Sequence, residues 1–518
     1  MHNKTLLKTF SLIFLGFFLI NSLNSYSQEE NKPLKWSYGI KDYGHGIENL
    51  GATEQYMLVQ INNNKSDIAI LSLTNFNTIK RVKAFTPKVN NQSLTYEKGI
   101  VFKKEFIVLA NNANKQYVLH YSLPKFKLIK SIEIGSIKAS MEISDEQYLD
   151  QFSIKKQAKN IEFFKSDDKN SLMVLYNNSG LDSSGMINYV AHIISPYFND
   201  TTYSINLDGL YHQFDLLNTL LTNEGIPYLF YKLENEDNQI QYNLYDGNIK
   251  HQLAIEMPIV IYNQKLIEDQ SGILILGICY FDESYSFFQY NYLSDMQRFG
   301  EMVFTNLDAD IVSEIEKTTD RNKDGNLSIQ PLNNYYIDGS IMINDDTRMI
   351  YGENYSLTKV FINKKIRIRH TAKELFILVT NTQGELLFFR TFPKLQNFEN
   401  SAQQNPSWGS YIFFHKNEEF HFLFQEDNDP FELSNSKAYK NKKVIKPKGK
   451  ASKTIDLIFN YNFEEDNQQW LDNTKLKIYP SPFISIDLGK GLYIIGSENT
   501  YDATKQIFKF SKFKYREY

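Results

Sequence analysis

The sequence of 518 residues contains a single cysteine, Cys279, so the chain cannot form an internal disulfide bond. The fold must therefore be held by an apolar core and by backbone hydrogen bonds. Cys279 lies in the apolar run from Ile273 to Phe281, which predicts a buried strand with the thiol as a small core residue. No cysteine lies near the N-terminus either, which argues against a lipoprotein.

The sequence also lacks the short motifs that mark common catalytic centres. It has no His-Glu-x-x-His zinc motif, no Gly-x-Ser-x-Gly nucleophile turn and no glycine-rich phosphate loop. The nine histidines are scattered without metal-ligand spacing. The residues therefore predict no particular reaction.

An excess of positive charge is missing as well. Without the lysines of residues 1–27, Lys4 and Lys8, the chain has 54 basic and 60 acidic residues, a net charge of about −6. Nucleic-acid-binding domains are strongly basic, so we expect no nucleic-acid partner.

The first 27 residues have the order of a cleavable export signal. Lys4 and Lys8 precede an apolar run from Phe10 to Ile20, and small residues stand at Ser25 and Ser27. The run is shorter than the roughly 20 residues that span a bilayer, and no later stretch is long and apolar enough. We expect residues 1–27 to be removed, and residues 28–518 to be exported to the periplasm or cell surface with no membrane span.

The dominant sequence pattern is short apolar runs separated by Asn, Asp, Gly and Lys clusters, which predicts an all-β protein. Hairpin turns are expected at Asp246-Gly247 and at 381–384. Two triplets of strands are expected at 56–61, 67–73 and 79–85, and at 105–110, 116–122 and 128–134, and further sets near 171, 226, 272, 374, 419 and 490.

The mean step between these sets is about 50 residues, the size of a four-stranded propeller blade. We therefore predict one β-propeller domain of about seven or eight four-stranded blades. A pair of β-sandwiches is the alternative. Residues 307–317 have helical apolar spacing, so we expect a short helix-plus-loop insertion over 307–330.

The C-terminal 200 residues or so resemble a group of exported propeller-like proteins of Bacteroidetes bacteria. The resemblance rests on the order of the predicted helix and of several strands and turns, and its most specific piece is the Pro-Lys-x-Gln stretch at 393–396. The sequence departs from the group in having Phe389 where an indole is common. The resemblance implies a propeller fold and an exported location, but no reaction and no site residues. The matching segments are 374–379, 384–389, 392–396, 422–424, 427–428 and 492–496.

One loop matches the first half of an EF-hand calcium site. Oxygen-bearing residues alternate there, and glycine follows at the sharp turn. Position 12, where a bidentate glutamate is needed, is Pro331, so any calcium binding should be weak, and calorimetry at millimolar calcium tests it. The candidate ligands are Asp320, Asn322, Asp324 and Asn326.

Three other groups of charged residues are better explained as ordinary surface or strand positions. The lysine-rich stretch 440–453 could bind an anionic glycan or lipid, but its composition predicts a solvated loop. The acidic groups at 426–429 and 464–466 fit turns. His421 alternates with Phe420 and Phe422, which indicates a structural residue on the opposite strand face.

Three functional hypotheses follow. The first is a non-catalytic binding or scaffold protein whose partner is an envelope protein or polysaccharide, since propellers present loops on a rigid disc. The second is a glycan-active enzyme with carboxylates at the propeller face. The third is an adhesion module steadied by calcium, the one cofactor that the sequence offers.

Overall fold

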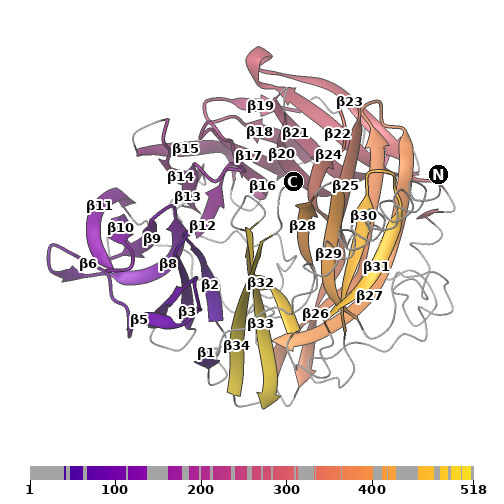
Figure 1. Cartoon of the computed structure of the whole chain (residues 1–518). Helices are drawn as coiled ribbons and strands as arrows, with labels where there is room; N and C mark the ends of the chain where they lie inside the picture. The colour runs from indigo at the N-terminus through magenta and orange to yellow at the C-terminus, as the bar shows by residue number, and fades with distance from the viewer. Residues whose placement is uncertain are drawn as a thin grey trace, which may run out of the picture.

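The computed structural model describes most of the chain between Ile40 and Lys514, and the described residues form eight four-stranded antiparallel sheets. Figure 1 shows these sheets arranged as the blades of a propeller. The expected propeller is confirmed. The described ranges are 40–42, 47–61, 67–112, 115–136, 161–177, 186–197, 200–210, 214–234, 240–253, 260–269, 272–281, 284–308, 311–312, 332, 334–362, 365–400, 411–416, 418–426, 453–471, 479–487, 492–502 and 505–514.

Blades 1 to 4 follow one another along the chain, each with its innermost strand first. Blade 1 has β2 (Ile47–Ala52), β3 (Tyr56–Ile61), β4 (Asp67–Ser72) and β5 (Thr78–Val82). Blade 2 has β8 (Thr95–Phe102), β9 (Glu105–Asn111), β10 (Lys115–Ser122) and β11 (Lys127–Ser136). Blade 3 has β12 (Ile161–Lys165), β13 (Leu172–Asn177), β14 (Met186–Ile194) and β15 (Thr201–Leu210). Blade 4 has β16 (Phe214–Leu221), β17 (Pro227–Glu234), β18 (Ile240–Tyr245) and β19 (Lys250–Gln252).

Blades 5 to 7 continue the order, and a short hairpin, β6 (Lys88–Val89) and β7 (Gln92–Ser93), joins blades 1 and 2. Blade 5 has β20 (Val260–Asp269), β21 (Gly272–Phe281), β22 (Ser284–Leu293), the one-turn helix η2 (Ser294–Met296) and β23 (Arg298–Asn306). Blade 6 has β24 (Tyr335–Met342), β25 (Thr347–Ile362), β26 (Lys365–Asn381) and β27 (Leu386–Asn400). Blade 7 has β28 (Ile412–Lys416), β29 (Glu419–Glu426), β30 (Lys453–Asn460) and β31 (Glu465–Leu471).

Blade 8 closes the ring with strands from both ends of the domain. It contains β32 (Tyr479–Asp487), β33 (Leu492–Asp502), β34 (Lys505–Lys514) and, at its outer edge, β1 (Ile40–Asp42). Ile40 pairs with Phe508 in an antiparallel register. Because a sheet edge left open would expose unpaired backbone groups, pairing the first strand with the last locks the ring by hydrogen bonds.

The apolar core lies between consecutive blades. Tyr228 and Phe230 of blade 4, for example, pack in one cluster with Ile275 and Phe288 of blade 5. Similar clusters join each described pair from blades 1 and 2 through blades 6 and 7. Blades 2 to 6 therefore bury apolar side chains on both faces, and Cys279 is fully buried in β21, as predicted.

Five inner strands have an irregularity at an equivalent place. Each has one extra residue opposite its partner strand, and such a bulge bends the strand and increases its twist. The irregularities fall at Asn49/Gly51 in β2, Tyr96/Lys98 in β8, Leu216/Asn218 in β16, Ile261/Asn263 in β20 and Ile337/Gly339 in β24.

The residue after the bulge contacts the next blade. Asn218 Nδ2 donates to Gln264 O at 3.2 Å, and Asn263 Nδ2 donates to Tyr335 O at 2.7 Å. At the same position of blade 2, Lys98 Nζ lies 5.9 Å from the Phe163 ring centroid of blade 3. Gly51, with φ +107°, approaches so closely that a Cβ atom would lie 3.1 Å from Val101 Cβ.

Blades 1 and 2 share a sequence repeat that spans their outer turns. Ser72-Leu73-x-x-Phe76-x-x-Ile79-Lys80 recurs 50 residues later, from Ser122 to Lys130. Phe76 and Phe126 both have left-handed backbone, with φ of 56° and 60°, and each donates its N–H to the serine carbonyl at 2.7 Å. The equivalent lysines both reach the next blade: Lys80 Nζ donates to Lys125 O, and Lys130 pairs with Asp200.

The expected helical insertion is visible only at its start. The Val312 N–H donates to Asp308 O at 3.0 Å, and Ile311 and Val312 pack against the core between blades 5 and 6. The rest of 307–330 lies largely outside the described residues, as does the signal segment 1–27. In the part that the structure describes, no helix has the length and apolar character needed to cross a bilayer.

We predict that Asn218→Ala and Asn263→Ala each destabilise the fold by about 1–3 kcal/mol, because a backbone carbonyl of the next blade loses its donor. Urea denaturation of the purified protein measures the effect. Asn248→Ala, in an exposed turn, is the control and should change stability by less than about 0.5 kcal/mol. Equal, small effects for all three variants would contradict the proposed role.

Candidate functional site

The predicted calcium ligands Asp320, Asn322, Asp324 and Asn326 lie outside the described residues, as does the lysine-rich stretch apart from Lys453. Among the described residues, no group of three or more His, Cys, Asp or Glu side chains could hold a metal ion. The calcium loop therefore stays a prediction.

The acidic group at 464–466 begins in a turn, as the sequence predicts. Glu464 is exposed between β30 and β31, and its Oε2 accepts a hydrogen bond from Asn460 Nδ2 at 2.9 Å. Its N–H donates to Asn460 Oδ1 at 3.0 Å. Of the other acidic group, Glu426 ends β29, and Asp427 and Asp429 lie outside the described residues.

His421 is buried against an acidic partner. Its Nδ1 lies 3.1 Å from Asp456 Oδ2, and its Nε2 lies 3.6 Å from Glu419 Oε2. The ring stacks on Phe414 with centroids 4.6 Å apart. Burial of the histidine and of Asp456, together with these contacts, fits the structural role inferred from the alternating pattern.

Three inner-strand ends bring a further group of polar residues together, which we call the turn cluster. It consists of Asp167 and Asp168 in the β12–β13 turn, Asn223 and Glu224 in the β16–β17 turn, and Glu268 near the end of β20. Blades 3, 4 and 5 are consecutive, so equivalent ends of their inner strands meet on the same face of the ring.

Asn223 links the backbone of Asp168 to the carboxylate of Glu268. The Asp168 N–H donates to Asn223 Oδ1 at 2.8 Å, and the Asn223 N–H donates to Glu268 Oε2 at 2.8 Å. Asp168 Oδ1 in turn accepts from Ser166 Oγ at 2.6 Å and from the Asn170 N–H at 2.9 Å. The hydrogen bonds thus fix the position of both acids.

The pKa values of these two carboxyl groups are shifted in opposite directions. Partial burial and then the negative charges of Asp167, Asp168 and Glu224 raise the pKa of Glu268 above its ordinary value. Burial also opposes ionisation of Asp168, but hydrogen bonds from Ser166 and Asn170 outweigh it and hold the pKa of Asp168 below its ordinary value. A site that needs one protonated and one ionised carboxyl group uses such a difference.

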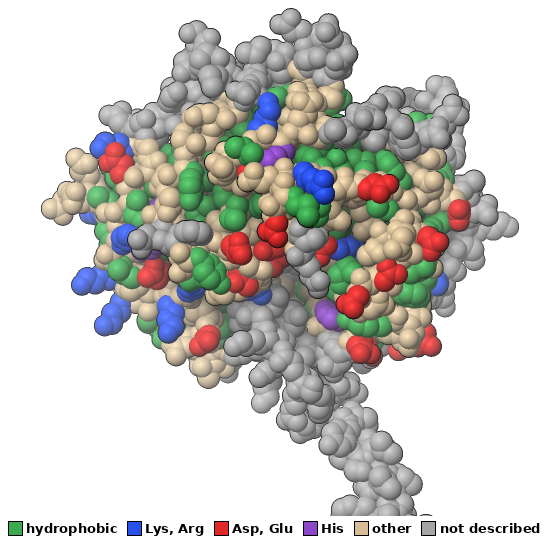
Figure 2. Space-filling model, turned by 90° about the horizontal axis from the view of Figure 1, so that it is seen from above, with side chains coloured by type: hydrophobic (Ala, Val, Ile, Leu, Met, Phe, Trp, Pro, Cys, Tyr) green, Lys and Arg blue, Asp and Glu red, His purple; other side chains and the backbone are tan. Residues whose placement is uncertain are grey.

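Charge is divided over the propeller. In blades 1 and 2, over the described residues between 47 and 136, Lys and Arg number 11 and Asp and Glu number 6. Between 186 and 308, which covers the outer half of blade 3 and blades 4 and 5, the described residues include 4 basic and 11 acidic ones. Figure 2 shows the acidic side chains mostly in the middle and right of one face and most basic ones toward its left end.

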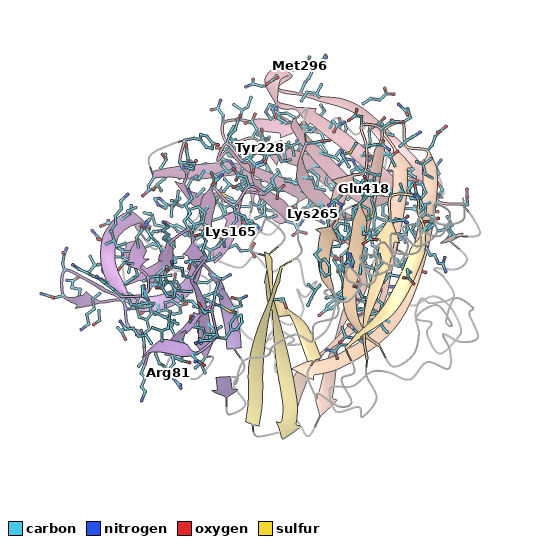
Figure 3. All side chains as sticks on the ribbon, viewed as in Figure 1. Arg81, Lys165, Tyr228, Lys265, Met296 and Glu418 are labelled. Carbon is cyan, nitrogen blue, oxygen red and sulfur yellow. The ribbon has the colours of Figure 1, made fainter. Side chains whose placement is uncertain are left out.

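Two lysines stand beside the turn cluster, and Figure 3 shows Lys165 and Lys265 near the middle of the ring. Lys165 ends β12, and its Nζ donates to Val101 O of blade 2 at 3.0 Å. Its side chain reaches solvent but is surrounded by protein, and this burial, together with the charge of Lys169, lowers the pKa of Lys165 to about 8. The cluster therefore has an amine at its edge that is mostly charged at pH 7 and about half charged near pH 8.

The Pro-Lys-x-Gln stretch proves to be a polar joint between blades 6 and 7. Lys394 is fully buried, with Nζ 3.2 Å from Glu353 Oε1 and 4.8 Å from the Tyr411 ring centroid. Gln396 Nε2 donates to Gln425 O at 3.1 Å. Because both charges are paired and out of reach of solvent, this group holds the long strands of blade 6 against blade 7 and is unsuited to binding a ligand.

Comparisons with known proteins show no relative from which a function could be transferred. No protein-family model and no curated protein matches the chain. A polysaccharide lyase structure aligns with 11% identity and a TM-score of 0.37, covering 91% of this chain and 100% of that one. The WD40 domain of SCAP from fission yeast aligns with 7% identity and a TM-score of 0.35, covering 93% and 98%. An uncharacterized protein from Listeria monocytogenes EGD-e aligns with 10% identity and a TM-score of 0.36, covering 92% and 97%.

The turn cluster was not predicted from the sequence, because its acids are about 50 residues apart and each stands in an ordinary polar turn. One available signal was their common place at the ends of inner strands. A second signal was the pair Glu224 and Gly225 after Asn223, which marks a tight turn; Gly225 has a positive φ of 86°.

The buried residue His192 makes the stability of the fold depend on pH. His192 in β14 has no exposed surface, and its Nδ1 lies 2.9 Å from Thr202 Oγ1. Burial lowers the pKa of His192 to about 4. The positive charges of His120 and Lys130 act in the same direction, whereas the negative charge of Asp200 acts in the opposite direction. The folded state therefore keeps this ring neutral at a pH where the unfolded chain binds a proton.

We predict that His192 alone reduces the free energy of unfolding by about 2 kcal/mol between about pH 7 and about pH 5, because only the unfolded state is protonated in that window. Urea denaturation across this range should show a shallower pH dependence for His192→Asn than for the original protein. Parallel pH profiles for the two proteins would show that His192 is not the source.

Proposed function

We propose that the protein is an exported, non-catalytic binding or scaffold protein of the periplasm or cell surface. The observation that carries the proposal is the division of charge, with net basic blades 1 and 2 separated by blade 3 from net acidic blades 4 and 5. Such a field orients a charged partner during approach and raises the rate of encounter.

The framework beneath this surface is suited to holding a binding face in shape. Consecutive blades are joined by apolar clusters and by polar joints such as Asn263 to Tyr335 O and Gln396 to Gln425 O. A ring closed by β1 and β34 fixes the relative positions of its loops. Preorganised surfaces of this kind lose little entropy on binding, which supports recognition.

We predict selective, salt-sensitive binding when the purified protein is applied to an array of bacterial and algal glycans, with and without calcium. Raising NaCl from about 50 to about 300 mM should weaken the binding, because the attraction is electrostatic. If no glycan binds, the same immobilised protein is tested against purified envelope proteins. If neither the glycans nor the envelope proteins bind at low salt, the proposal is contradicted.

A second candidate is a glycan-active enzyme, and the turn cluster is the specific observation in its favour. Glu268, with its raised pKa, could donate a proton to a leaving oxygen, while ionised Asp168 could act as base or nucleophile. Asn223 links the two acids through hydrogen bonds. The pKa shifts of Glu268 and Asp168 have the directions that a general acid and a base or nucleophile require.

For the enzyme alternative, we expect release of reducing ends from a glycan that the array identifies, and loss of that release by at least about 100-fold in Glu268→Gln, which cannot donate a proton. Glu224→Gln, an exposed acid of the same cluster, is the control and should retain most of the activity. A bound glycan that the original protein leaves intact over hours would favour the binding function.

A further inference from the structure

Exposed lysines gather where blades 1 and 2 meet at the rim. We call this group the rim patch: Lys80 in β5, Lys83 after it, Lys88 in β6, and Lys125 and Lys127 on either side of the β10–β11 turn. All five residues are exposed. Lys80 Nζ donates to Lys125 O at 2.7 Å, so the two blades are in direct contact here.

An aromatic cluster beneath the patch holds its segments together. Phe126 lies between Lys125 and Lys127, and its ring centroid is 5.1 Å from that of Phe85 and 5.5 Å from that of Tyr121. Phe85 stands between Lys83 and Lys88 in the sequence. Because the rings of Phe85 and Phe126 pack inward, the neighbouring lysines of both segments lie on one continuous surface.

The buried acid Asp67 neutralises a nearby arginine and leaves the lysines without compensation. Arg81 Nε and Nη2 both donate to Asp67 Oδ2, at 3.2 and 2.7 Å. Asp67 Oδ1 accepts the N–H of Ala84 at 2.9 Å, which fixes the left-handed backbone next to Lys83. Asp67 is only 4% exposed, so its negative charge interacts with Arg81 and the Ala84 N–H and not with the lysines of the rim patch.

The internal repeat shows that the turn itself does not require lysine. Blade 1 has Asn75 and Asn77 at the positions of Lys125 and Lys127 in blade 2, around the same left-handed phenylalanine. The serine, leucine, phenylalanine, isoleucine and last lysine of the repeat are identical in both blades. The serine carbonyl and the phenylalanine N–H form the backbone hydrogen bond of the turn, whereas the two isoleucines are exposed. Lysine at 125 and 127 therefore needs an explanation other than the fold.

We propose that the rim patch binds a linear anionic polysaccharide, one that carries carboxylate or sulfate groups along its length. The proposal rests on the binding function proposed above and names its ligand class. A single exposed amine contributes little to binding, so affinity must come from several amines engaged at once. A chain with regularly repeated negative charges provides this and releases counterions on binding.

Two other polyanions fit the patch less well. Single-stranded nucleic acid is bound on exposed aromatic platforms, whereas Phe85 is buried and Phe126 is half-buried beneath the lysines. Duplex nucleic acid covers a wide area and would extend over blade 3, whose described residues are net acidic. A polysaccharide chain is narrow enough to follow the rim where blades 1 and 2 meet.

The test is biolayer interferometry of the full-length protein against polygalacturonate, dextran sulfate, uncharged dextran and duplex DNA. We expect binding to polygalacturonate or dextran sulfate that weakens with salt, and none to dextran. The double variant Lys125→Asn, Lys127→Asn should bind at least about fivefold more weakly. Phe126 then has asparagine on both sides, as Phe76 has in blade 1, and thermal melting should confirm an intact fold.

The matched control removes two exposed cations from the acidic side, Lys250→Asn and Arg298→Asn, and should change affinity less than about twofold. Equal loss in both double variants, no binding to either anionic glycan, or tighter binding to DNA than to the glycans would overturn the inference. If the glycan array is positive while the rim variant binds the array ligand normally, the rim patch is excluded and the proposed binding function stands. If nothing binds in either experiment, both fail.

Discussion

Neighbouring blades are joined by a polar side chain of one sheet that reaches a backbone or charged group of the next. Asn218, Asn263 and Lys80 all end on a carbonyl oxygen of the following blade, and so does Gln396, whose side chain donates to Gln425 O of blade 7. Apolar packing between sheets is strong but has no direction. A hydrogen bond to one particular carbonyl fixes both the angle and the height at which two sheets meet, and the ring can close only if these offsets are nearly the same at every junction.

The inner-strand bulges follow from the same constraint. An unbulged strand would keep its side chains perpendicular to its own sheet, but the bulge twists the strand so that the next residue, Asn218 or Asn263, reaches the following blade. At the same place Gly51 has no side chain because Val101 is too close for one. One position therefore carries asparagine, lysine or glycine, according to the width of the gap.

These facts explain how far the sequence could predict the fold. In blades 1 to 7, the described side chains of the second and third strands are largely buried, and these strands appear as apolar runs. The sets near 171, 226, 272 and 419 therefore correspond to β13, β17, β21 and β29. Inner strands are half-exposed and bulged, so their alternation is broken and most were missed. The predicted set at 374 starts in β26, the third strand of blade 6, and not in the second strand as the other sets do. The second strand, β25, continues for 16 residues through mixed polar sequence. The pairing of β1 with β34 joins two segments that are more than 450 residues apart, a contact that local pattern cannot reveal.

The charged surface has a different origin from the framework. Core clusters of the same apolar character join blades 1 and 2 and blades 4 and 5, yet the first pair is net basic and the second net acidic. Concentrating like charges costs stability, because they repel one another in the compact state. Lysine is not required beside the left-handed phenylalanine, since Phe76 has the same backbone hydrogen bond to serine with Asn75 and Asn77 on either side. The binding function proposed above accounts for the charge pattern through an external partner.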